Sequence, residues 1–283
     1  MFIIIGGVIV LGCVVGGYLL SKGNIHILWQ PNEFIIIGGA ALGSFIIASP
    51  LRVLKQVAGC VGMVLKGKVH GKDFYLQLLT LLYDIFAKMR KEGLLSIEKD
   101  LEAPESSQIF QKYPDVIHNH HLTDFIADNL KIIVSIPVQP HEIDNLMELD
   151  IDSTHGDEHV VAHSINTVAE SFPGLGIVAA VLGIVVTMGS INEPPEVLGH
   201  HIGAALIGTF VGILVCYGFL GPFATNLAHL FRLEGIAFNS VRAALVAYMQ
   251  TTSPQMAVEF GRRAIPAVDR PSFSELEKAV KKK

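Results

Sequence analysis

Long apolar runs separated by short polar links dominate the pattern of this chain. Four runs are long enough to cross a bilayer as a helix, which takes about 20 residues. They cover residues 2–20, 34–51, 172–191 and 202–220. No Asp, Glu, Lys or Arg lies inside any of them. The pattern therefore predicts an all-α integral membrane protein with four transmembrane helices.

The connection between the second and third runs is about 120 residues long, and a segment of that length must fold. Apolar positions at helical spacing predict helices over 73–90 and 116–136, and Gly93 is expected to break or cap the first. A further helix starts at Pro140 and is expected to continue into the third membrane span. The long loop is therefore predicted to be helical.

The tail also has a helical pattern, over 223–252, and Pro254 breaks it. The chain is thus expected to have four parts. They are 1–52 with transmembrane helices 1 and 2, 53–171 as a cytoplasmic helical domain, 172–222 with transmembrane helices 3 and 4, and 223–283 as a cytoplasmic C-terminal helix and tail.

The cationic residues predict the orientation in the membrane. Of the 21 lysines and arginines, all but Lys22 lie in the long loop or the tail. Cytoplasmic segments carry an excess of these residues, so both termini and the long loop are predicted to be cytoplasmic. The first apolar run has no charged segment before it, which favours a transmembrane helix over a signal peptide. Five cations follow the second run closely: Arg52, Lys55, Lys66, Lys68 and Lys72.

A patch of both charges stands out in a chain with 51% hydrophobic and only 17% charged residues. One interpretation is a solvated helix end, which is what most charge runs are. The other is a docking surface, since separated positive and negative clusters suit reversible recognition of a charged partner. Lys88, Arg90 and Lys91 precede Gly93, and Glu98, Asp100, Glu102 and Glu105 follow it.

The polarity within the membrane runs is modest, and Thr209 and Tyr217 on the fourth run are part of it. An ion carrier places an ionisable group at membrane depth, and the predicted spans contain none. If the protein conducts ions, the titrating carboxylate is therefore expected to come from another polypeptide. Glycine pairs four residues apart, such as Gly208 and Gly212, allow close helix packing, either within one subunit or between subunits.

Two prolines flank the predicted third and fourth spans on the cytoplasmic side. Pro173 is expected to open the third helix and Pro222 to close the fourth, positions where proline is tolerated. A functional interpretation is that they fix the joints through which movement in the bilayer reaches the cytoplasmic helices.

The sequence offers no pattern for an enzyme, a metal site, a cofactor or a nucleic-acid partner. Twelve histidines are present, but neither HExxH nor CxxC accompanies them. Phosphate-binding glycine loops, nucleophile elbows and paired carboxylates are also missing from the sequence.

Several longer segments resemble the MotA family, the stator subunits of the bacterial flagellar motor within the MotA/TolQ/ExbB proton-channel superfamily. The resemblance covers almost the whole chain. It is carried by "QPNEFIIIGGAALGSF", "SFPGLGIVAAVLGIVVTMGS", "GAALIGTFVGILVCYGFLGP" and "AVEFGRRAIPAVDRPSFSELE".

The resemblance implies a homopentameric ring in the bacterial inner membrane around a dimer of MotB, whose transmembrane aspartate carries the ion. Ion flow would turn the ring and push the rotor protein FliG, in flagellum-dependent motility and chemotaxis. Sodium-driven relatives tend to carry threonine where this chain has Ala180, and a missing hydroxyl removes an oxygen ligand for sodium, so protons are favoured.

The resemblance also suggests roles for individual residues. Arg90 and Glu98 match the family's rotor-contact charges, and Lys88 and Lys91 lie beside them in the patch. Pro173 and Pro222 match its two functional prolines, and Thr209 matches its pore-lining threonine, with Ala180 and Tyr217 grouped on the same ion pathway.

Two rival functions remain. One is an energy-coupling subunit of the ExbB or TolQ type, which drives outer-membrane processes. The other is a membrane scaffold that conducts no ions.

Overall fold

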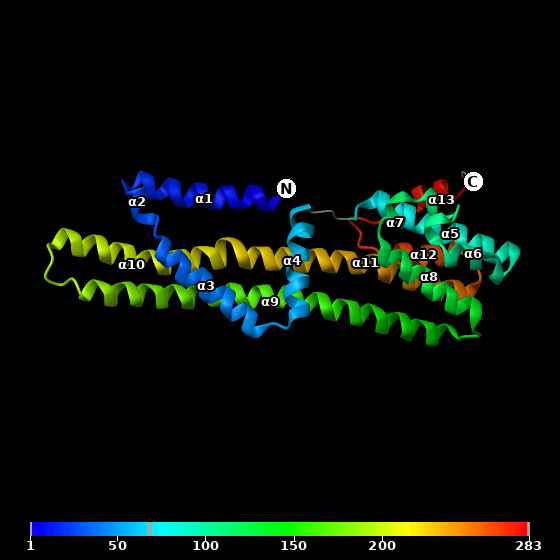
Figure 1. The fold of residues 1–283 in the computed structure, drawn as a ribbon. Helices are drawn as coiled ribbons and strands as arrows, with labels where there is room; N and C mark the ends of the chain where they lie inside the picture. The colour runs from blue at the N-terminus through cyan, green and yellow to red at the C-terminus, as the bar shows by residue number, and fades with distance from the viewer. Residues whose placement is uncertain (1, 67–69, 282–283) are drawn as a thin grey trace. The chain divides into compact units, whose positions relative to one another are not determined.

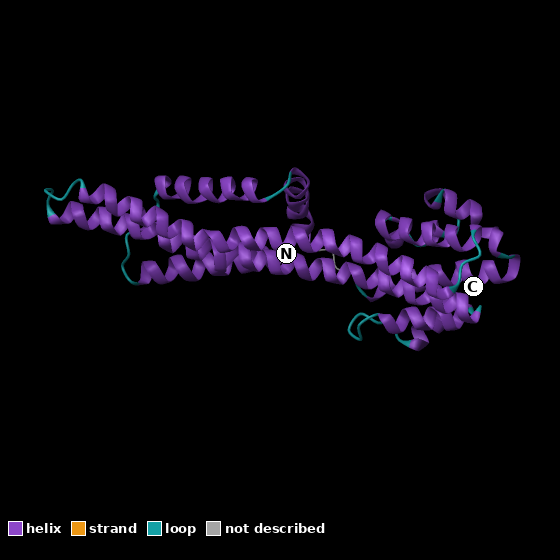
Figure 2. Cartoon of the chain, turned by 90° about the horizontal axis from the view of Figure 1, so that it is seen from below, coloured by secondary structure: helices purple, strands orange, loops and turns teal. Residues whose placement is uncertain are grey.

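Every element of the described chain is a helix (Figures 1 and 2). The structure, a computed structural model, describes residues 2–66 and 70–281, so the predicted orienting charge Lys68 lies outside the described residues. The all-α prediction is confirmed. The contacts divide the chain into two compact units: a membrane unit, residues 1–68 and 157–230, and a loop–tail unit, residues 69–156 and 231–283.

The membrane unit contains the four helices that are long and apolar enough to cross a bilayer. Compared with the predicted four parts, it also takes in α4 and residues 157–171 and 223–230. Its elements are α1 (Phe2–Leu20), α2 (Ile25–Leu28), α3 (Pro31–Ala48), α4 (Leu51–Lys66), the later part of α9 (Pro140–Met188), α10 (Pro195–Val215), a π-helical segment η4 (Cys216–Leu220) and the start of α11 (Gly221–Thr251).

Helices α9 and α10 lie side by side in this unit (Figures 1 and 2). Their backbones meet at glycines: a β-carbon added at Gly212 would lie 2.4 Å from the carbonyl oxygen of Phe172, and one at Gly176 would lie 2.6 Å from that of Gly208. Only glycine permits so close an approach. For Gly208 and Gly212, the structure therefore decides in favour of packing within one chain.

The predicted helix ends at the two prolines are wrong. Pro173 lies inside α9, which starts at Pro140 and runs without a break to Met188. Pro222 lies in the first turn of α11, after the π-helical segment, so it does not close the fourth helix either. Proline lacks an N–H and crowds the carbonyl four residues earlier, but neighbouring helices and local π geometry allow a membrane helix to continue through it.

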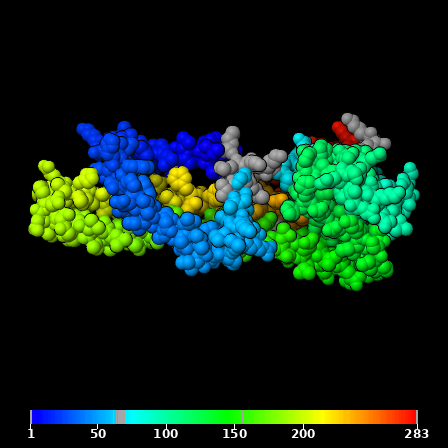
Figure 3. Space-filling model, in the orientation of Figure 1, coloured from blue at the N-terminus to red at the C-terminus, as the bar shows by residue number. Residues whose placement is uncertain are grey.

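The loop–tail unit is a bundle of shorter helices around an apolar core. The surface of this unit is visible in the space-filling view (Figure 3). The predicted helix 116–136 is split, because Asn119 caps a new helix by accepting a hydrogen bond from the Leu122 N–H (3.2 Å). The elements are α5 (Lys72–Glu92), η1 (Leu94–Ile97), α6 (Glu98–Glu102), η2 (Pro104–Ser106), η3 (Phe110–Lys112), α7 (Pro114–Ile117), α8 (His120–Ser135), the start of α9, the later part of α11, α12 (Pro254–Ala264) and α13 (Phe273–Lys281).

Helix α5 forms the centre of that core, and its predicted apolar face is buried. Phe86 of α5 stacks on Tyr248 of α11 with ring centroids 4.4 Å apart. Helix α12 packs against α5. Gly261 of α12 brings its backbone close to α11, where the Ser240 hydroxyl donates to the Gly261 carbonyl (2.9 Å). The tail is thus part of this core.

Candidate functional site

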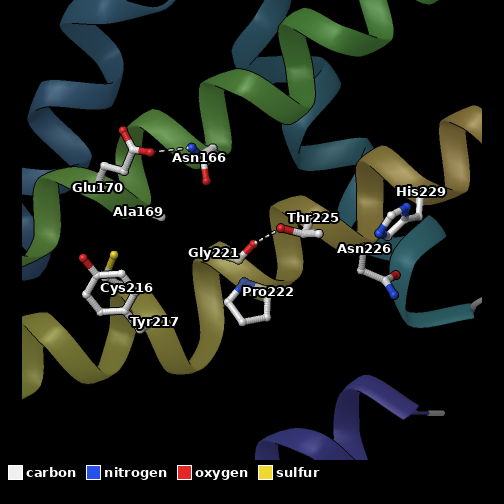
Figure 4. Close-up of a pocket in the computed structure, with 10 residues that line it drawn as sticks. All are labelled: Asn166, Ala169, Glu170, Cys216, Tyr217, Gly221, Pro222, Thr225, Asn226 and His229. Carbon is white, nitrogen blue, oxygen red and sulfur yellow. Dashed lines mark hydrogen bonds between the residues drawn. The ribbon is translucent and has the colours of Figure 1, made fainter.

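A cavity of about 490 Å³ lies in the membrane unit between α9 and the run formed by η4 and α11 (Figure 4). Ala169 and Glu170 line it from α9, and Tyr217, Pro222 and His229 line it from the other run. Two of the residues predicted from the sequence, Tyr217 and Pro222, therefore meet here. The Tyr217 side chain is 73% exposed.

The irregularities caused by both prolines reach this cavity. Ala169, four residues before Pro173, lines it, and its carbonyl is the one that the missing N–H of Pro173 would have bonded. On the facing side, the Gly221 N–H bonds to the Cys216 carbonyl five residues earlier, which is the π-helical pattern just before Pro222. Such π segments are frequent at functional sites. Both prolines therefore change the backbone hydrogen-bond pattern of a helix beside the same cavity.

Two hydrogen bonds fix polar side chains at the cavity. The Asn166 amide donates to the Glu170 carboxylate (2.7 Å), and the Thr225 hydroxyl donates to the Gly221 carbonyl (3.0 Å) (Figure 4). Among the described residues, no cluster of three or more His, Cys, Asp or Glu side chains could hold a metal ion.

Thr209 and Ala180 lie at a different level, where α9 and α10 touch. A β-carbon on Gly176 would come within 3.2 Å of the Thr209 Cα, and one on Gly208 would come within 3.2 Å of the Ala180 nitrogen. Ala180 is buried and Thr209 is half-buried. The structure thus brings these two predicted pathway residues together, while Tyr217 lies at the cavity instead.

The two-signed patch surrounds the turn at Gly93 in the loop–tail unit. Gly93 ends α5 with φ +90°, a conformation that favours glycine, and its N–H bonds to the Met89 carbonyl (3.0 Å). Lys88 pairs with Asp100 across the turn (2.7 Å), and the Ser107 hydroxyl also donates to Asp100 (2.6 Å). This pair bridges the two sides of the turn.

The remaining predicted contact residues are available on the surface. Arg90, Lys91 and Glu98 are exposed, and within the described ranges 2–66 and 70–281 none of them makes an ion pair. The four predicted contact residues therefore differ in whether they make an ion pair within the described chain. Lys88 supports the turn, and the other three present both charges to solvent.

Ionised groups elsewhere in the loop–tail unit hold the tail in place. Glu259 accepts two hydrogen bonds from Arg262 (2.7 Å each) and one from Arg263 (2.9 Å), and these cations lower its pKa. Arg262 is buried and also donates to the Pro271 carbonyl (3.0 Å). On the surface, hydrogen bonds from Lys72 and Ser272 lower the pKa of Glu275 to about 2.

The sequence did not indicate that Glu33 is a buried acid of the membrane unit. Glu33 lies one position before the predicted second span, but α3 starts at Pro31 and includes it. Its side chain is buried in the membrane unit, only 8% exposed. The predicted span 34–51 contains no ionisable group, but α3, the helix that covers most of it, does. Pro31 could have indicated that the helix starts before Glu33, since proline is common at the first position of a helix.

Comparison with known proteins identifies the family. Residues 4–93 match the model for the Motility protein A N-terminal region, and residues 118–235 match the MotA/TolQ/ExbB proton channel family. Motility protein A of Escherichia coli (strain K12) is 39% identical over 281 residues, which is 99% of this chain and 95% of that protein. This chain belongs to the Motility protein A family. The predicted family membership is confirmed.

Another motility-related protein and two solved structures are also similar to this chain. Chemotaxis protein LafT of Vibrio parahaemolyticus is 38% identical over 97% of this chain and 96% of its own length. The structure of C. jejuni MotAB matches with a TM-score of 0.79 and 18% identity, covering 96% of this chain and 98% of that chain. The flagellar MotAB stator complex from Bacillus subtilis matches at 0.76 and 21%, covering 94% and 96%. These two structures share the fold.

Family membership settles two further predictions at a coarse level. A proton-channel family is not an enzyme family, so the predicted non-enzymatic role is confirmed. The four apolar helices and the family together make the chain a multi-pass inner-membrane protein.

Proposed function

We propose that this chain is a stator subunit of the bacterial flagellar motor that couples proton flow to torque on the rotor protein FliG. The observation that carries the proposal is the 39% identity to a motility protein over 99% of the chain. A match to the family's N-terminal model, residues 4–93, weighs against an ExbB or TolQ type of subunit. The match of residues 118–235 to a proton channel family weighs against a non-conducting scaffold.

The partner in this proposal is MotB, which supplies the ion-carrying aspartate, and the working assembly is a pentamer around a MotB dimer. Two observations support an assembly. Glycines on α1 and α3, at Gly12, Gly16, Gly39 and Gly43, have no atom within 4 Å of an added β-carbon. Many large apolar side chains of α1, α3, α9 and α10 are also exposed, and lipid or further subunits would cover them.

Protons, not sodium ions, are the proposed driving ion. Ala180 brings no hydroxyl to the α9–α10 contact, and the atoms nearest to an added β-carbon at Gly208 are one Glu33 carboxylate oxygen, the Ala179 β-carbon and the Ala180 backbone nitrogen. Sodium is a hard cation that needs several oxygen ligands. Thr209 belongs to the proposed ion pathway, and Pro173 and Pro222, beside the cavity, form the proposed joints. Both termini are proposed to be cytoplasmic.

The proposed rotor contact is the exposed part of the patch: Arg90, Lys91 and Glu98. Both charges are on one turn fixed by Gly93 and the Lys88–Asp100 pair, so their spacing is held by the fold. Electrostatic complementarity of this kind favours fast, reversible and specific contact, which a rotor passing a stator requires.

The experiment that tests the function is rotation of tethered cells. A stator-deleted, flagellated host receives this chain with its cognate MotB. Rotation that stops with a protonophore and continues without sodium supports the proposal. Rotation that depends on sodium contradicts the proton assignment. No rotation, despite correct membrane insertion and MotB binding, contradicts the stator assignment and favours an energy-coupling role.

A further inference from the structure

Glu33 is a buried acid in the membrane unit for which the function described so far has no use. Its Oε2 atom is the buried side-chain oxygen or nitrogen that has no hydrogen-bond partner in the described chain. The side chain is more than nine-tenths buried. Buried polar groups are nearly always satisfied, so an unsatisfied carboxyl requires an explanation.

The space around this carboxyl is made by two glycines on the adjoining helices. A β-carbon at Gly208 of α10 would lie 2.7 Å from Glu33 Oε2, and one at Gly183 of α9 would lie 3.4 Å from Oε1. Under 3.0 Å an added carbon collides, so an alanine at Gly208 would displace the carboxyl. Glycine at position 208 therefore leaves room for the acid as well as for helix packing.

No charge on the surrounding helices balances this acid. From α9 and α10, the carboxyl and its two glycines are faced by Ala179, Ala205 and the backbone of Ala180. Within the described residues, no lysine, arginine or histidine forms an ion pair with Glu33. The buried hydroxyl of Thr187 on α9 donates to the Gly183 carbonyl (2.8 Å). A buried carboxylate without a partner is expensive, and a bound proton removes its charge.

The same surroundings favour a proton over a metal cation as the ligand. Sodium or a divalent ion needs a set of oxygen ligands. The atoms nearest to the two glycine positions are β-carbons, a backbone nitrogen and the Glu33 carboxylate itself. A proton needs only the carboxylate.

The position of the carboxyl connects it to the residues proposed for ion flow. Gly208 precedes Thr209 in α10 and adjoins the backbone of Ala180. We infer that Glu33 is a proton-binding residue of this chain, a second carboxyl beside the pathway that the partner's aspartate serves. The inference rests on the proposed stator function.

The chemistry is a proton transfer in two steps. The carboxylate of Glu33 accepts a proton from hydronium on the outer side, forming an O–H bond and releasing water. That O–H bond then breaks as the proton moves to the carboxylate of the MotB-type partner, and Glu33 is ionised again. No oxidant, metal or further reactant takes part.

The test compares three full-length variants with the cognate MotB in the stator-deleted host. Glu33→Gln keeps the size of the side chain but cannot exchange a proton, and Glu33→Asp keeps the acid. Asn32→Ala, at an exposed position of the same helical turn, is the matched control. We expect Glu33→Gln to lower torque at least tenfold, about 1.4 kcal/mol in barrier height, with unchanged membrane level and MotB copurification. Glu33→Asp should retain part of the torque, and Asn32→Ala all of it.

Wild-type torque in Glu33→Gln would overturn the inference. So would an assembled but inactive Glu33→Asp variant. The failure of the wild-type chain itself to rotate would instead contradict the proposed function, which keeps the two failures distinct.

A second measurement covers the case in which Glu33→Gln does not assemble. Infrared spectra of the purified wild-type complex, with ¹³C-labelled glutamate, should contain a protonated-carboxyl C=O band that shifts in D₂O. In the Glu33→Asp complex the shifted, labelled band should be missing. A wild-type complex without such a band, or a Glu33→Asp complex that retains it, would overturn the inference.

Discussion

The two units of this chain differ in how far they bury their large apolar side chains. In the loop–tail unit, the large apolar residues are buried against one another, among them Tyr75, Phe86 and Phe110 with 1% exposure or less. In the membrane unit, α1 buries no residue at all, and large side chains such as Ile47 and Leu20 are almost fully exposed. One unit is complete within the chain, and the other has surfaces that lipid or further subunits must cover.

Polar groups show the same contrast. In the loop–tail unit, buried Arg262 is bound by Glu259 and the Pro271 carbonyl, and Arg242 of α11 is bound by Asp144 and Glu148 of α9. In the membrane unit, buried Glu33 lacks such a partner. The two arginines stabilise the fold of the loop–tail unit through ion pairs within the chain. The buried carboxyl of the membrane unit has no such partner among the described residues, so it is available to bind a proton.

The largest expected effect comes from removing a core side chain of the loop–tail unit. Phe86→Ala should lower the free energy of unfolding by about 3–5 kcal/mol, because it leaves a cavity and ends the stacking on Tyr248. Leu95→Ala is the control: its side chain is 70% exposed, and a change within about 0.5 kcal/mol is expected. Denaturation of the detergent-solubilised protein, followed by circular dichroism, measures both. Equal effects would show that this unit has no separate core.

The next effect concerns the ion pairs of the tail. Glu259→Gln should lower stability by about 1.5–3 kcal/mol, since it weakens the hydrogen bonds to buried Arg262. Since the folded pKa of Glu259 is below its usual 4.5, its contribution is present above about pH 4.5 and is lost as pH falls through the lower folded value. Thermal denaturation of wild type and variant from pH 7 to 3 should therefore converge in acid. A constant difference would contradict this.

A third prediction compares two glycines of the membrane unit. Gly212→Ala should destabilise the protein by about 1–3 kcal/mol, because the added carbon meets the Phe172 carbonyl. Gly43→Ala adds a carbon in open space and should leave the folding of the chain unchanged or slightly stabilised. The measurement is the melting temperature of the chain in detergent. A loss at Gly43 as large as that at Gly212 would mean that the chain itself covers this face.

The smallest effect separates the residues of the charged patch. Lys88→Met should lower the stability of the loop–tail unit by about 1 kcal/mol, since Asp100 loses its ion pair. Arg90→Ala should change it by less than about 0.5 kcal/mol, because Arg90 is exposed and unpaired among the described residues. Thermal melts of the two purified variants provide the comparison. An equal loss in both would mean that Arg90 also supports the turn.

Much of the fold could be predicted, because length and apolar pattern determine a membrane helix. The span 2–20 coincides with α1, and the continuation of the helix from Pro140 into the membrane is confirmed. The ends at Pro173 and Pro222 could not be predicted. Local proline rules give a boundary there, whereas tertiary packing and π geometry carry the helices through.

The candidate site was predictable residue by residue but not in its arrangement. Family resemblance indicated Pro173 and Pro222, and the polarity of the fourth run indicated Tyr217, yet the cavity that Tyr217 and Pro222 share depends on how α9 and α11 pack. Glu33 was missed because hydropathy places an acid outside a span, and only tertiary contacts reveal its burial. The Lys88–Asp100 pair was likewise hidden within a run of charges.

The most direct test of the account is a double charge swap in the patch, Arg90→Glu with Glu98→Lys, read by torque and by MotB copurification from the same cells. If the loop–tail unit docks the rotor and the membrane unit binds MotB, torque should fall at least tenfold while membrane level and copurified MotB remain at wild-type values. Unchanged torque, or a parallel loss of MotB, would contradict this division between the two units.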